Sequence, residues 1–314
     1  MFTVDDFRRM FVDPIRHPAM VSALEESMTP GATVLDLGSG PAMYGFHALR
    51  LGASHVYAIE PHAAAIALGE QLAFQNHLQD RITFYPSMSF DVELPEKADV
   101  LVADLRDSVP FFGRNLDSIV DAKARLLKPN AIIIPRSDRG LMAPITSTSL
   151  RNRFSSWADN TAGIDTLPAA ELIANQYHFD HLASDQIRAE PVSYGTINYG
   201  IDQDGSTPVG WSGVVDIASD GIVDALGLWF ESDLTPRVKL RSGPGGARIY
   251  RTKQLPIFPA VAVRRGDRFE FSVRADFTGS AYRWFWQGAR VGEEAIRRCG
   301  DLAVLPPRSR AGSK

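Results

Sequence analysis

The chain has 314 residues, 45% of them hydrophobic, which is enough to bury the cores of about two domains. Its formal net charge is −4 and lysine and arginine form no block, so the composition disfavours a nucleic-acid-binding protein. Cys299 is the only cysteine, which excludes an intrachain disulfide and a zinc site built from cysteines.

The N-terminal segment does not resemble a signal peptide, because it carries charges at positions 5, 6, 8 and 9 and has no apolar core. No apolar run approaches the ~20 residues that a membrane-spanning helix needs. We therefore expect a cytoplasmic protein that binds no membrane.

The first 145 residues alternate strand-like and helix-like segments. Short, uniformly apolar runs are typical of strands that a parallel sheet buries on both faces. The expected strands cover residues 33–37, 56–59, 82–85, 100–103 and 131–134. The expected helices cover residues 42–51, 63–77 and 116–127, the last ending before the helix stop and turn at 128–130. The alternation predicts a doubly wound α/β sheet in a first domain of residues 1–137.

After residue 137 the pattern changes to short strands separated by turns rich in glycine, proline and aspartate. Phe269, Phe271 and Val273 alternate with polar residues, which is the period of a half-buried antiparallel strand. The expected strands cover residues 213–217, 225–231, 247–250, 268–275 and 282–287. We predict a β-sandwich or barrel domain over residues 138–305, with a partly helical insertion at about 147–184 and a disordered tail at 306–314.

The stretch "VLDLGSGPAMYG", residues 34–45, runs from the first expected strand through Asp36 into a turn at Gly38 and Gly40, and then into a helix. Such a unit points backbone N–H groups at a helix N-terminus, where an adenosyl ligand packs closely. An isolated Gly-x-Gly turn can also be no more than a tight corner in an α/β protein.

The residues around this turn favour a nucleoside over a dinucleotide. Glu60 ends the second strand, twenty residues after Gly40, at the place where a carboxylate binds both ribose hydroxyls. Met43 stands where a dinucleotide site has its third glycine, so a pyrophosphate would fit less well. S-adenosylmethionine has no phosphate and tolerates a looser turn.

Two further features favour the same ligand. Arg16, in "MFVDPIR", lies twenty residues before Asp36, so an N-terminal helix could place its guanidinium on the ligand's carboxylate, in a contact that can be bidentate. Met88 and Ser89, in "RITFYPSMS", follow the third strand, where an adenine ring is usually sandwiched. The alternatives are a surface arginine and a methionine that fills the core.

These segments resemble the protein arginine methyltransferase family in order and spacing. The resemblance is dense in the first half, in "VLDLGSGPAMYG", "GASHVYAIEP", "NHLQDRITFY", "VELPEKADVLVADL" and "LLKPNAIIIPRSD". "MFVDPIR" resembles the family's cofactor-closing helix. In the second half "ALGLWFESDL", "AVAVRRGDRFEFSV" and "AYRWFWQ" resemble strands of its barrel domain. The resemblance covers roughly residues 8–290.

The resemblance implies a Rossmann-like class I methyltransferase domain followed by a β-barrel, with S-adenosylmethionine as the cofactor. It also implies a head-to-tail homodimer and cofactor contacts at Arg16, Gly38 and Glu60. Together with the pattern of the turn, the predicted cofactor-binding residues are Arg16, Asp36, Gly38, Gly40, Glu60, Met88 and Ser89.

The chain departs from the family in the loop after the fourth strand, where the family carries two glutamates that clamp the substrate guanidinium. Here the loop is "ADLRDSVPFFGRN": Asp104 takes the first glutamate's place, and the second falls near Phe112 and Gly113 without a carboxylate. The family's Thr-His-Trp motif has no match in "ARIYRTKQLPIFP". A planar guanidinium needs two fixed acceptors to orient it, so the loss of one should weaken arginine recognition severely. "ADLRD" more closely resembles the "SDLRG" loop of bacterial proteins similar to the family.

The loop carries the candidate catalytic residues. Ligands of parallel α/β sheets bind at the carboxyl ends of the strands, and Asp104 directly follows the fourth strand. We predict that Asp104 orients or deprotonates an N–H or O–H acceptor, with Asp107 as its assistant or as the anchor of a cationic substrate. Arg106 either binds an anionic group of the substrate or pairs with one of these aspartates. The alternative for all three is a cluster of surface ion pairs.

His178 and His181 are the other candidate bases or metal ligands, because a spacing of three would place them on one helix face. No third ligand accompanies them, so solvated or core histidines are the simpler interpretation, and we expect no metal.

The main hypothesis is an S-adenosylmethionine-dependent methyltransferase that acts on a nitrogen or oxygen of a small molecule or modified amino acid. The first alternative is a protein arginine methyltransferase with a remodelled guanidinium clamp. The second is a non-catalytic binding protein that retains the fold, and the intact cofactor residues argue against it.

Overall fold

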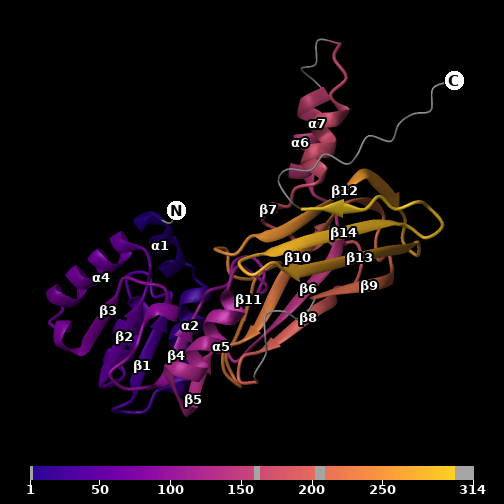
Figure 1. Cartoon of the computed structure of the whole chain (residues 1–314). Helices are drawn as coiled ribbons and strands as arrows, with labels where there is room; N and C mark the ends of the chain where they lie inside the picture. Colours follow the sequence, from indigo (N-terminus) through magenta and orange to yellow (C-terminus); the bar gives the residue numbers. More distant parts are fainter. Residues whose placement is uncertain (1–2, 159–162, 202–208, 301–314) are drawn as a thin grey trace.

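The computed structural model of the chain describes residues 3–158, 163–201 and 209–300. Figure 1 shows two halves side by side, a parallel sheet with helices packed against it and a second half built from antiparallel strands. A pair of helices projects from the second half, away from the parallel sheet.

The first half contains a five-stranded parallel sheet in the order β3-β2-β1-β4-β5. Its strands are β1 (Thr33–Leu37), β2 (His55–Ile59), β3 (Ile82–Tyr85), β4 (Ala98–Ala103) and β5 (Leu127–Ile134). All five residues of β1 are buried, because β2 and β4 flank this strand on either side. The strand order reverses between β1 and β4, and such a switch point is where open α/β sheets bind ligands.

Helices precede and connect these strands: α1 (Val4–Phe11), α2 (Arg16–Ser27), α3 (Met43–Arg50), α4 (Ala63–Gln75) and α5 (Asn115–Arg125), with the 3₁₀ turns η1 (Gln79–Arg81) and η2 (Ser89–Asp91). A capping box between Thr3 and Asp6 starts α1. The carboxylate of Asp13 accepts the backbone N–H of Arg16 at 2.8 Å and so starts α2. Arg16 therefore stands at the very beginning of its helix, beside the chain reversal that joins α1 to α2.

The second half contains two antiparallel sheets, as expected for a sandwich or barrel. One has the order β7-β12-β10-β6-β8 with β11 beside β10, and the other has the order β15-β14-β13-β9. The strands are β6 (Ser137–Ile145), β7 (His178–Asp180), β8 (Val192–Asn198), β9 (Val209–Asp216), β10 (Gly221–Asp233), β11 (Lys239–Arg241), β12 (Thr252–Val263), β13 (Arg268–Phe277), β14 (Tyr282–Arg290) and β15 (Arg298–Cys299). Phe269, Phe271 and Val273 are buried, as the alternation predicts.

The projecting helices are α6 (Thr148–Ala158) and α7 (Leu167–Ala174), and the 3₁₀ turn η3 (Ser184–Gln186) follows them after β7. They lie within the predicted insertion at about 147–184. The head-to-tail homodimer that the resemblance implies stays a prediction.

The two halves share one hydrophobic core. The largest cluster of buried residues joins Leu101 of β4 and Leu116 of α5 to Met142 of β6 and Trp284 of β14. Close packing of this kind fixes the second half against the carboxyl edge of the parallel sheet.

Three details of the sequence-based prediction were wrong. Residues 247–250 are not a strand, because the backbone N–H of Ile249 bonds to the Asp13 carboxylate at 2.9 Å instead of to a neighbouring strand. Residues 128–130 belong to β5, whose place at the edge of its sheet tolerates Pro129. His178 lies in β7 and not on a helix, so it shares no helix face with His181.

The predicted domain boundary after residue 137 falls at the beginning of β6, which opens the second half. The predicted tail, 306–314, lies outside the described residues. Among the residues that the structure describes, no helix combines the length and the apolar character needed to cross a membrane.

Candidate active site

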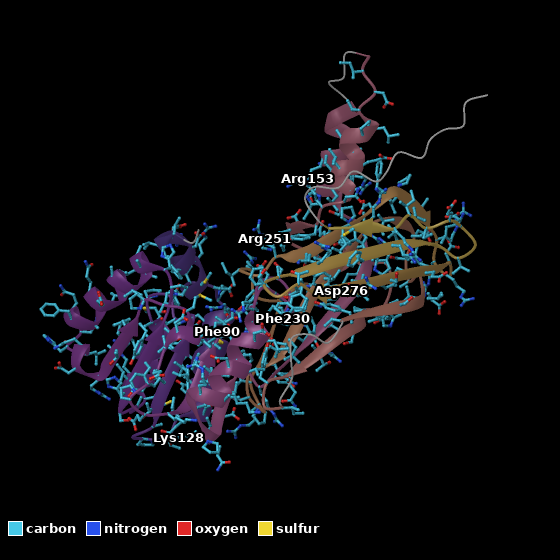
Figure 2. The ribbon with its side chains drawn as sticks, viewed as in Figure 1. Phe90, Lys128, Arg153, Phe230, Arg251 and Asp276 are labelled. Carbon is cyan, nitrogen blue, oxygen red and sulfur yellow. The ribbon has the colours of Figure 1, made fainter. Side chains whose placement is uncertain are left out.

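A cavity of about 1260 Å³ opens at the carboxyl ends of β1, β2 and β4. Its walls come from α1 and the glycine turn on one side and from the segment before β12 on the other. Figure 2 shows Arg251, one of the lining residues, between the two halves. All ten predicted site residues line this cavity: Arg16, Asp36, Gly38, Gly40, Glu60, Met88, Ser89, Asp104, Arg106 and Asp107.

The glycine turn requires its glycines for two reasons. Gly38 and Gly40 have φ values of +68° and +53°, in the left-handed region that favours glycine. A Cβ on Gly38 would collide with the side chain of Leu105, and a Cβ on Gly40 would lie 2.7 Å from a ring carbon of Phe7 in α1. Helix α1 therefore closes directly over the backbone of the turn.

The two acidic residues beside the turn hold its backbone. Glu60 accepts N–H groups from Gly40 at 3.0 Å and from His62 at 2.9 Å, one on each carboxylate oxygen. Asp36 accepts the N–H of Gly45 at 2.9 Å in the first turn of α3. Burial, together with the charge of Glu60, raises the pKa of Asp36 to about 7. Each oxygen of Glu60 keeps lone-pair capacity for a ligand in the cavity.

Met88 and Ser89 lie at the end of the cavity nearest β3, at the start of η2. Ser89 is buried, whereas Met88 is 43% exposed and so does not fill the core. An exposed thioether at a cavity wall suits contact with a flat ring, which is the role that the sequence suggests for Met88.

Arg16 is buried and its donors are almost fully used. Its Nε and Nη2 each lie 2.7 Å from Oδ2 of Asp104, and Nε also lies 3.1 Å from the hydroxyl of Tyr250. Its Nη1 donates to the hydroxyl of Tyr44 at 2.8 Å and to the carbonyl of Met10 at 3.3 Å. A guanidinium has five N–H donors, so one N–H of Nη2 remains for a ligand. The geometry leaves room for a single hydrogen bond to a ligand carboxylate rather than a bidentate one.

Arg106 approaches Asp104 from the opposite side. Its Nε and Nη2 lie 2.9 Å from Oδ1 of Asp104, and its Nη1 lies 2.8 Å from Asp138 in β6 and 2.8 Å from Ser232 in β10. Its guanidinium also lies 4.9 Å from the ring centre of Phe230. Of the two hypotheses for Arg106, the structure favours an ion pair over substrate binding, because these partners bury the whole guanidinium.

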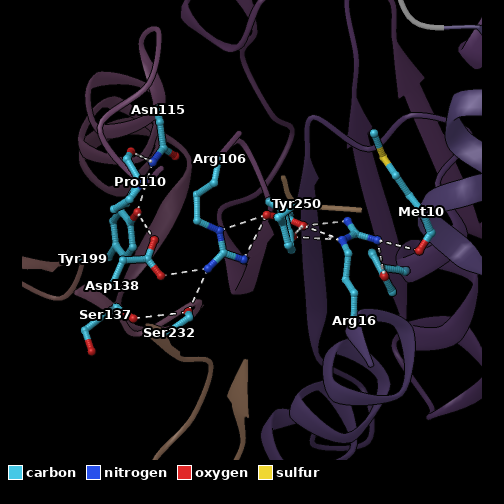
Figure 3. A network of polar contacts seen from close by, with 12 residues as sticks. Met10, Arg16, Arg106, Pro110, Asn115, Ser137, Asp138, Tyr199, Ser232 and Tyr250 are labelled. Atoms are coloured by element: carbon cyan, nitrogen blue, oxygen red, sulfur yellow. Dashed lines mark hydrogen bonds and ion pairs between the residues drawn. The ribbon is translucent and has the colours of Figure 1, made fainter. Parts of the chain in front are cut away.

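Figure 3 shows the complete network, with Arg106 and Arg16 on either side of Tyr250. Asp138 continues it by accepting the hydroxyl of Tyr199 at 2.7 Å, and Tyr199 accepts an N–H of Asn115 at 3.0 Å. The network therefore joins α2, the loop after β4, and strands β6 and β10. Because its charges are buried and paired, we expect it to fix the two halves against each other.

This network decides what Asp104 can do. Although burial alone would raise it, the guanidinium groups of Arg106 and Arg16 hold the pKa of Asp104 well below its ordinary value. The hydroxyl of Tyr250 also donates to Oδ2 of Asp104. A carboxylate with such a low pKa and so many donors is a poor proton acceptor, so the geometry favours positioning over deprotonation.

Asp107, three residues further, has a different environment. Its described hydrogen-bond partner is the hydroxyl of Ser108 at 3.4 Å, and no ion pair joins it to the described residues. Its charge acts on Lys253 of β12, which is buried among aromatic rings, 4.1 Å from the ring centre of Tyr177 and 4.7 Å from that of Trp284. Burial lowers the pKa of Lys253 to about 8, against the opposing charge of Asp107. Asp107 thus faces the cavity with most of its acceptor capacity unused.

Five residues that shape the site were not predicted from the sequence. Phe7 covers the turn, Tyr44 and Tyr250 hold Arg16, and Lys253 feels the charge of Asp107. The Nδ1 atom of His62 is buried without a hydrogen-bond partner in the described part of the chain, at the cavity wall beside Glu60. Tyr250 stands in "ARIYRTKQLPIFP", the segment already compared with a family motif, so its position could have been suspected.

Comparison with known proteins supports a methyltransferase. Residues 18–135 match the family model described as ribosomal protein L11 methyltransferase. An arginine N(omega)-methyltransferase of Streptomyces achromogenes subsp. streptozoticus is 27% identical over 278 residues, which cover 86% of this chain and 76% of that protein. A probable histone-arginine methyltransferase 1.4 of Arabidopsis thaliana is 32% identical over 168 residues, which cover 51% of this chain and 32% of that protein. The chain thus spans about a third of the plant protein's length.

Two solved structures share the fold over nearly the whole chain. The Trypanosoma brucei PRMT1 enzyme-prozyme complex with AdoHcy aligns with a TM-score of 0.82 at 18% identity, over 93% of this chain and 97% of that chain. Arabidopsis thaliana protein arginine methyltransferase 10 aligns with a TM-score of 0.80 at 19% identity, over 96% and 98%. At such identities the likeness establishes the architecture alone.

Proposed function

We propose that the methyl acceptor of this protein is a nitrogen of a small molecule. The premise is that the chain is an S-adenosylmethionine-dependent methyltransferase that resembles the protein arginine methyltransferases. The observation that carries the proposal is the state of the two loop carboxylates. Both carboxylate oxygens of Asp104 accept hydrogen bonds from buried arginines. Asp107 lines the cavity and can still accept hydrogen bonds from a ligand.

The cavity has the size that two ligands need. Single drug-sized ligands occupy pockets of about 300–1000 Å³, whereas this cavity has a volume of about 1260 Å³. A cofactor at the glycine turn would leave space between the loop after β4 and the segment before β12. We place the acceptor there, beside Asp107.

We propose that the residues around the turn hold S-adenosylmethionine. The free lone pairs of Glu60 suit the ribose hydroxyls, and the remaining N–H of Arg16 suits the carboxylate. The absence of Cβ atoms at Gly38 and Gly40 lets the backbone approach the ligand, and Met88 and Ser89 line the expected place of the adenine. The unpartnered Nδ1 of His62 adds a polar atom at this wall.

The acceptor side needs little chemistry of its own. When bound, the cofactor would supply a sulfonium methyl group for in-line transfer to the acceptor lone pair, with the thioether of S-adenosylhomocysteine as the leaving group. Asp107 orients the acceptor N–H and takes up the proton that the nitrogen gives up. Asp104 holds Arg16 and Tyr250 in place, and the closing helix α1 excludes water from the cavity.

An Asp107→Asn variant is expected to lose about two orders of magnitude in kcat/KM, because a neutral amide cannot take up the acceptor proton. The assay uses labelled S-adenosylmethionine with small nitrogen acceptors. L-arginine is tested first, because the Streptomyces relative is named an arginine N(omega)-methyltransferase. Affinity for S-adenosylhomocysteine, measured by calorimetry, should stay unchanged.

The same assay separates this proposal from its rival. Peptides rich in arginine should take up little label, because the place of the family's second glutamate, near Phe112 and Gly113, has no carboxylate, and Asp104 in the place of the first is already paired with Arg16 and Arg106. Strong labelling of peptide guanidinium groups, together with no labelling of small acceptors, would favour a protein arginine methyltransferase with a remodelled clamp.

A Gly40→Ala variant is expected to weaken binding of S-adenosylhomocysteine about tenfold or more. The new methyl group would meet Phe7 and displace α1, in addition to a left-handed backbone strain of ~1 kcal/mol. The matched control is Gly31→Ala: Gly31 has a φ of +84° and nothing within 4 Å of a Cβ. Equal affinity of the two variants would show that α1 does not close over the ligand.

A further inference from the structure

The segment between β11 and β12 presents two arginines to the cavity. Arg248 and Arg251 both line it, as Asp107 does, and Figure 2 shows Arg251 between the two halves. Both side chains are exposed.

The backbone of this segment is fixed from the first half of the chain. Asp13 accepts the N–H of Ile249 at 2.9 Å, and the hydroxyl of Tyr250, between the two arginines, donates to Asp104. The arginines therefore stand on a turn that is held at two points beside the cavity, so less conformational freedom is lost when they bind a ligand.

The arginines that line the cavity differ in their ion-pair partners. Its other arginines are paired: Arg9 with Asp6, and Arg16 and Arg106 with Asp104. Arg248 and Arg251 have no carboxylate within ion-pair distance among residues 3–158, 163–201 and 209–300, and Arg251 instead lies 5.8 Å from the ring centre of Phe179.

The part of the cavity lined by Arg248 and Arg251 therefore carries positive charge that no carboxylate of the described residues pairs with. Arg248 and Arg251 line this part of the cavity, and Asp107 is a lining carboxylate whose described hydrogen-bond partner is only the hydroxyl of Ser108. Asp13, Asp36 and Glu60 are each held by backbone N–H groups. An acceptor that is only cationic would meet net repulsion, whereas one with an anionic end would be attracted.

We propose that the methyl acceptor carries a free carboxylate, which Arg248 and Arg251 bind while its nitrogen faces Asp107. The inference rests on the proposed function and adds the substrate class: a zwitterion such as an amino acid. A guanidinium matches a carboxylate in geometry as well as charge, and two of them at a cavity rim fix the end of a small acceptor. An internal arginine of a peptide has no such carboxylate.

The test compares amino acids with their decarboxylated amines: L-arginine with agmatine, L-lysine with cadaverine, and L-histidine with histamine. Each compound is assayed with labelled S-adenosylmethionine, and its binding to the protein saturated with S-adenosylhomocysteine is measured by calorimetry. We expect one amino acid to be methylated and to bind at least tenfold more tightly than its amine.

The variants Arg248→Gln and Arg251→Gln locate the effect. Each should raise KM for that amino acid about tenfold with little change in kcat, and should leave the affinity for S-adenosylhomocysteine and for the matching amine unchanged. Arg241→Gln, an exposed arginine at the end of β11 that does not line the cavity, is the matched control and should behave as the wild type.

The possible failures are distinguishable. An amine that serves as well as its amino acid, or variants with unchanged KM, would overturn the carboxylate inference and leave the small-molecule function standing. If no compound is methylated, calorimetry decides: preferential binding of an amino acid that is lost in Arg251→Gln supports the arginine site, and the absence of any binding overturns it.

Discussion

An Asp104→Asn variant is expected to lose about 3–5 kcal/mol of unfolding free energy and all measurable methyl transfer. The carboxylate of Asp104 neutralises two buried guanidinium groups, those of Arg16 and Arg106, at 2.7 to 2.9 Å. Removing one partner from a buried ion pair leaves the other charge without compensation, which is among the most destabilising of single changes. Arg106 keeps Asp138, but Arg16 keeps only neutral partners. Denaturant unfolding at pH 7 measures the loss.

The pH dependence of this loss of unfolding free energy follows from the direction in which folding shifts the pKa of Asp104. The pKa of Asp104 is lower in the folded chain than in the unfolded chain, so the unfolded state binds more protons in acid. The stabilisation is therefore complete above pH ~4, the ordinary value for aspartate, and decreases as the pH falls below it. The difference between wild type and Asp104→Asn should shrink in the same range.

Asp107→Asn is the matched control for stability, because Asp107 lies in the same loop but outside the network. A partly exposed residue of this kind should change the unfolding free energy by less than ~0.5 kcal/mol. Equal destabilisation by the two variants would mean that the buried network does not hold the halves together.

An Arg16→Gln variant is expected to weaken binding of S-adenosylhomocysteine by one to two orders of magnitude. The variant loses the single N–H that remains for the ligand's carboxylate, and hydrogen bonds to charged groups contribute about 1.5–3 kcal/mol. It also frees Tyr44 and Tyr250 from the guanidinium that orders them. Calorimetry is done at a temperature at which the variant is folded.

Arg106→Gln separates ligand binding from stability. Arg106 pairs with the same carboxylate and is equally buried, but its other partners, Asp138 and Ser232, lie in the second half of the chain. Both Arg106→Gln and Arg16→Gln should lose unfolding free energy, because each removes a cation from the buried network, but Arg106→Gln should keep most of its affinity for the ligand. If both variants lost affinity to the same extent, the assignment of Arg16 to the ligand carboxylate would be untenable.

The sequence predicted the first half of the molecule well because its signals are local. Short, mostly apolar runs predicted β1 to β4, and the turn at Gly38 and Gly40 has the positive φ angles that only glycine adopts without strain. Glu60 lies beside that turn because parallel pairing of β1 with β2 places the ends of both strands together. These inferences needed no contact between distant segments.

The rest depended on contacts between residues far apart in sequence. Asp104 was predicted to act on the acceptor, but its partners Arg16 and Tyr250 come from α2 and from the segment before β12. Arg106 is bound by Asp138 of β6, which no spacing in the loop could indicate. Residues 247–250 have the composition of a strand, yet their backbone bonds to Asp13, 236 residues away from Ile249.

The central claim is that one cavity holds S-adenosylmethionine at the glycine turn and a small acceptor beside Asp107. A crystal structure of the protein with S-adenosylhomocysteine and the amino acid that it methylates tests this claim most directly. We predict ribose hydroxyls on Glu60, the cofactor carboxylate on Arg16 and the acceptor nitrogen within hydrogen-bond distance of Asp107. A nucleoside bound elsewhere, or an acceptor held by Asp104 with Asp107 turned away, would contradict it.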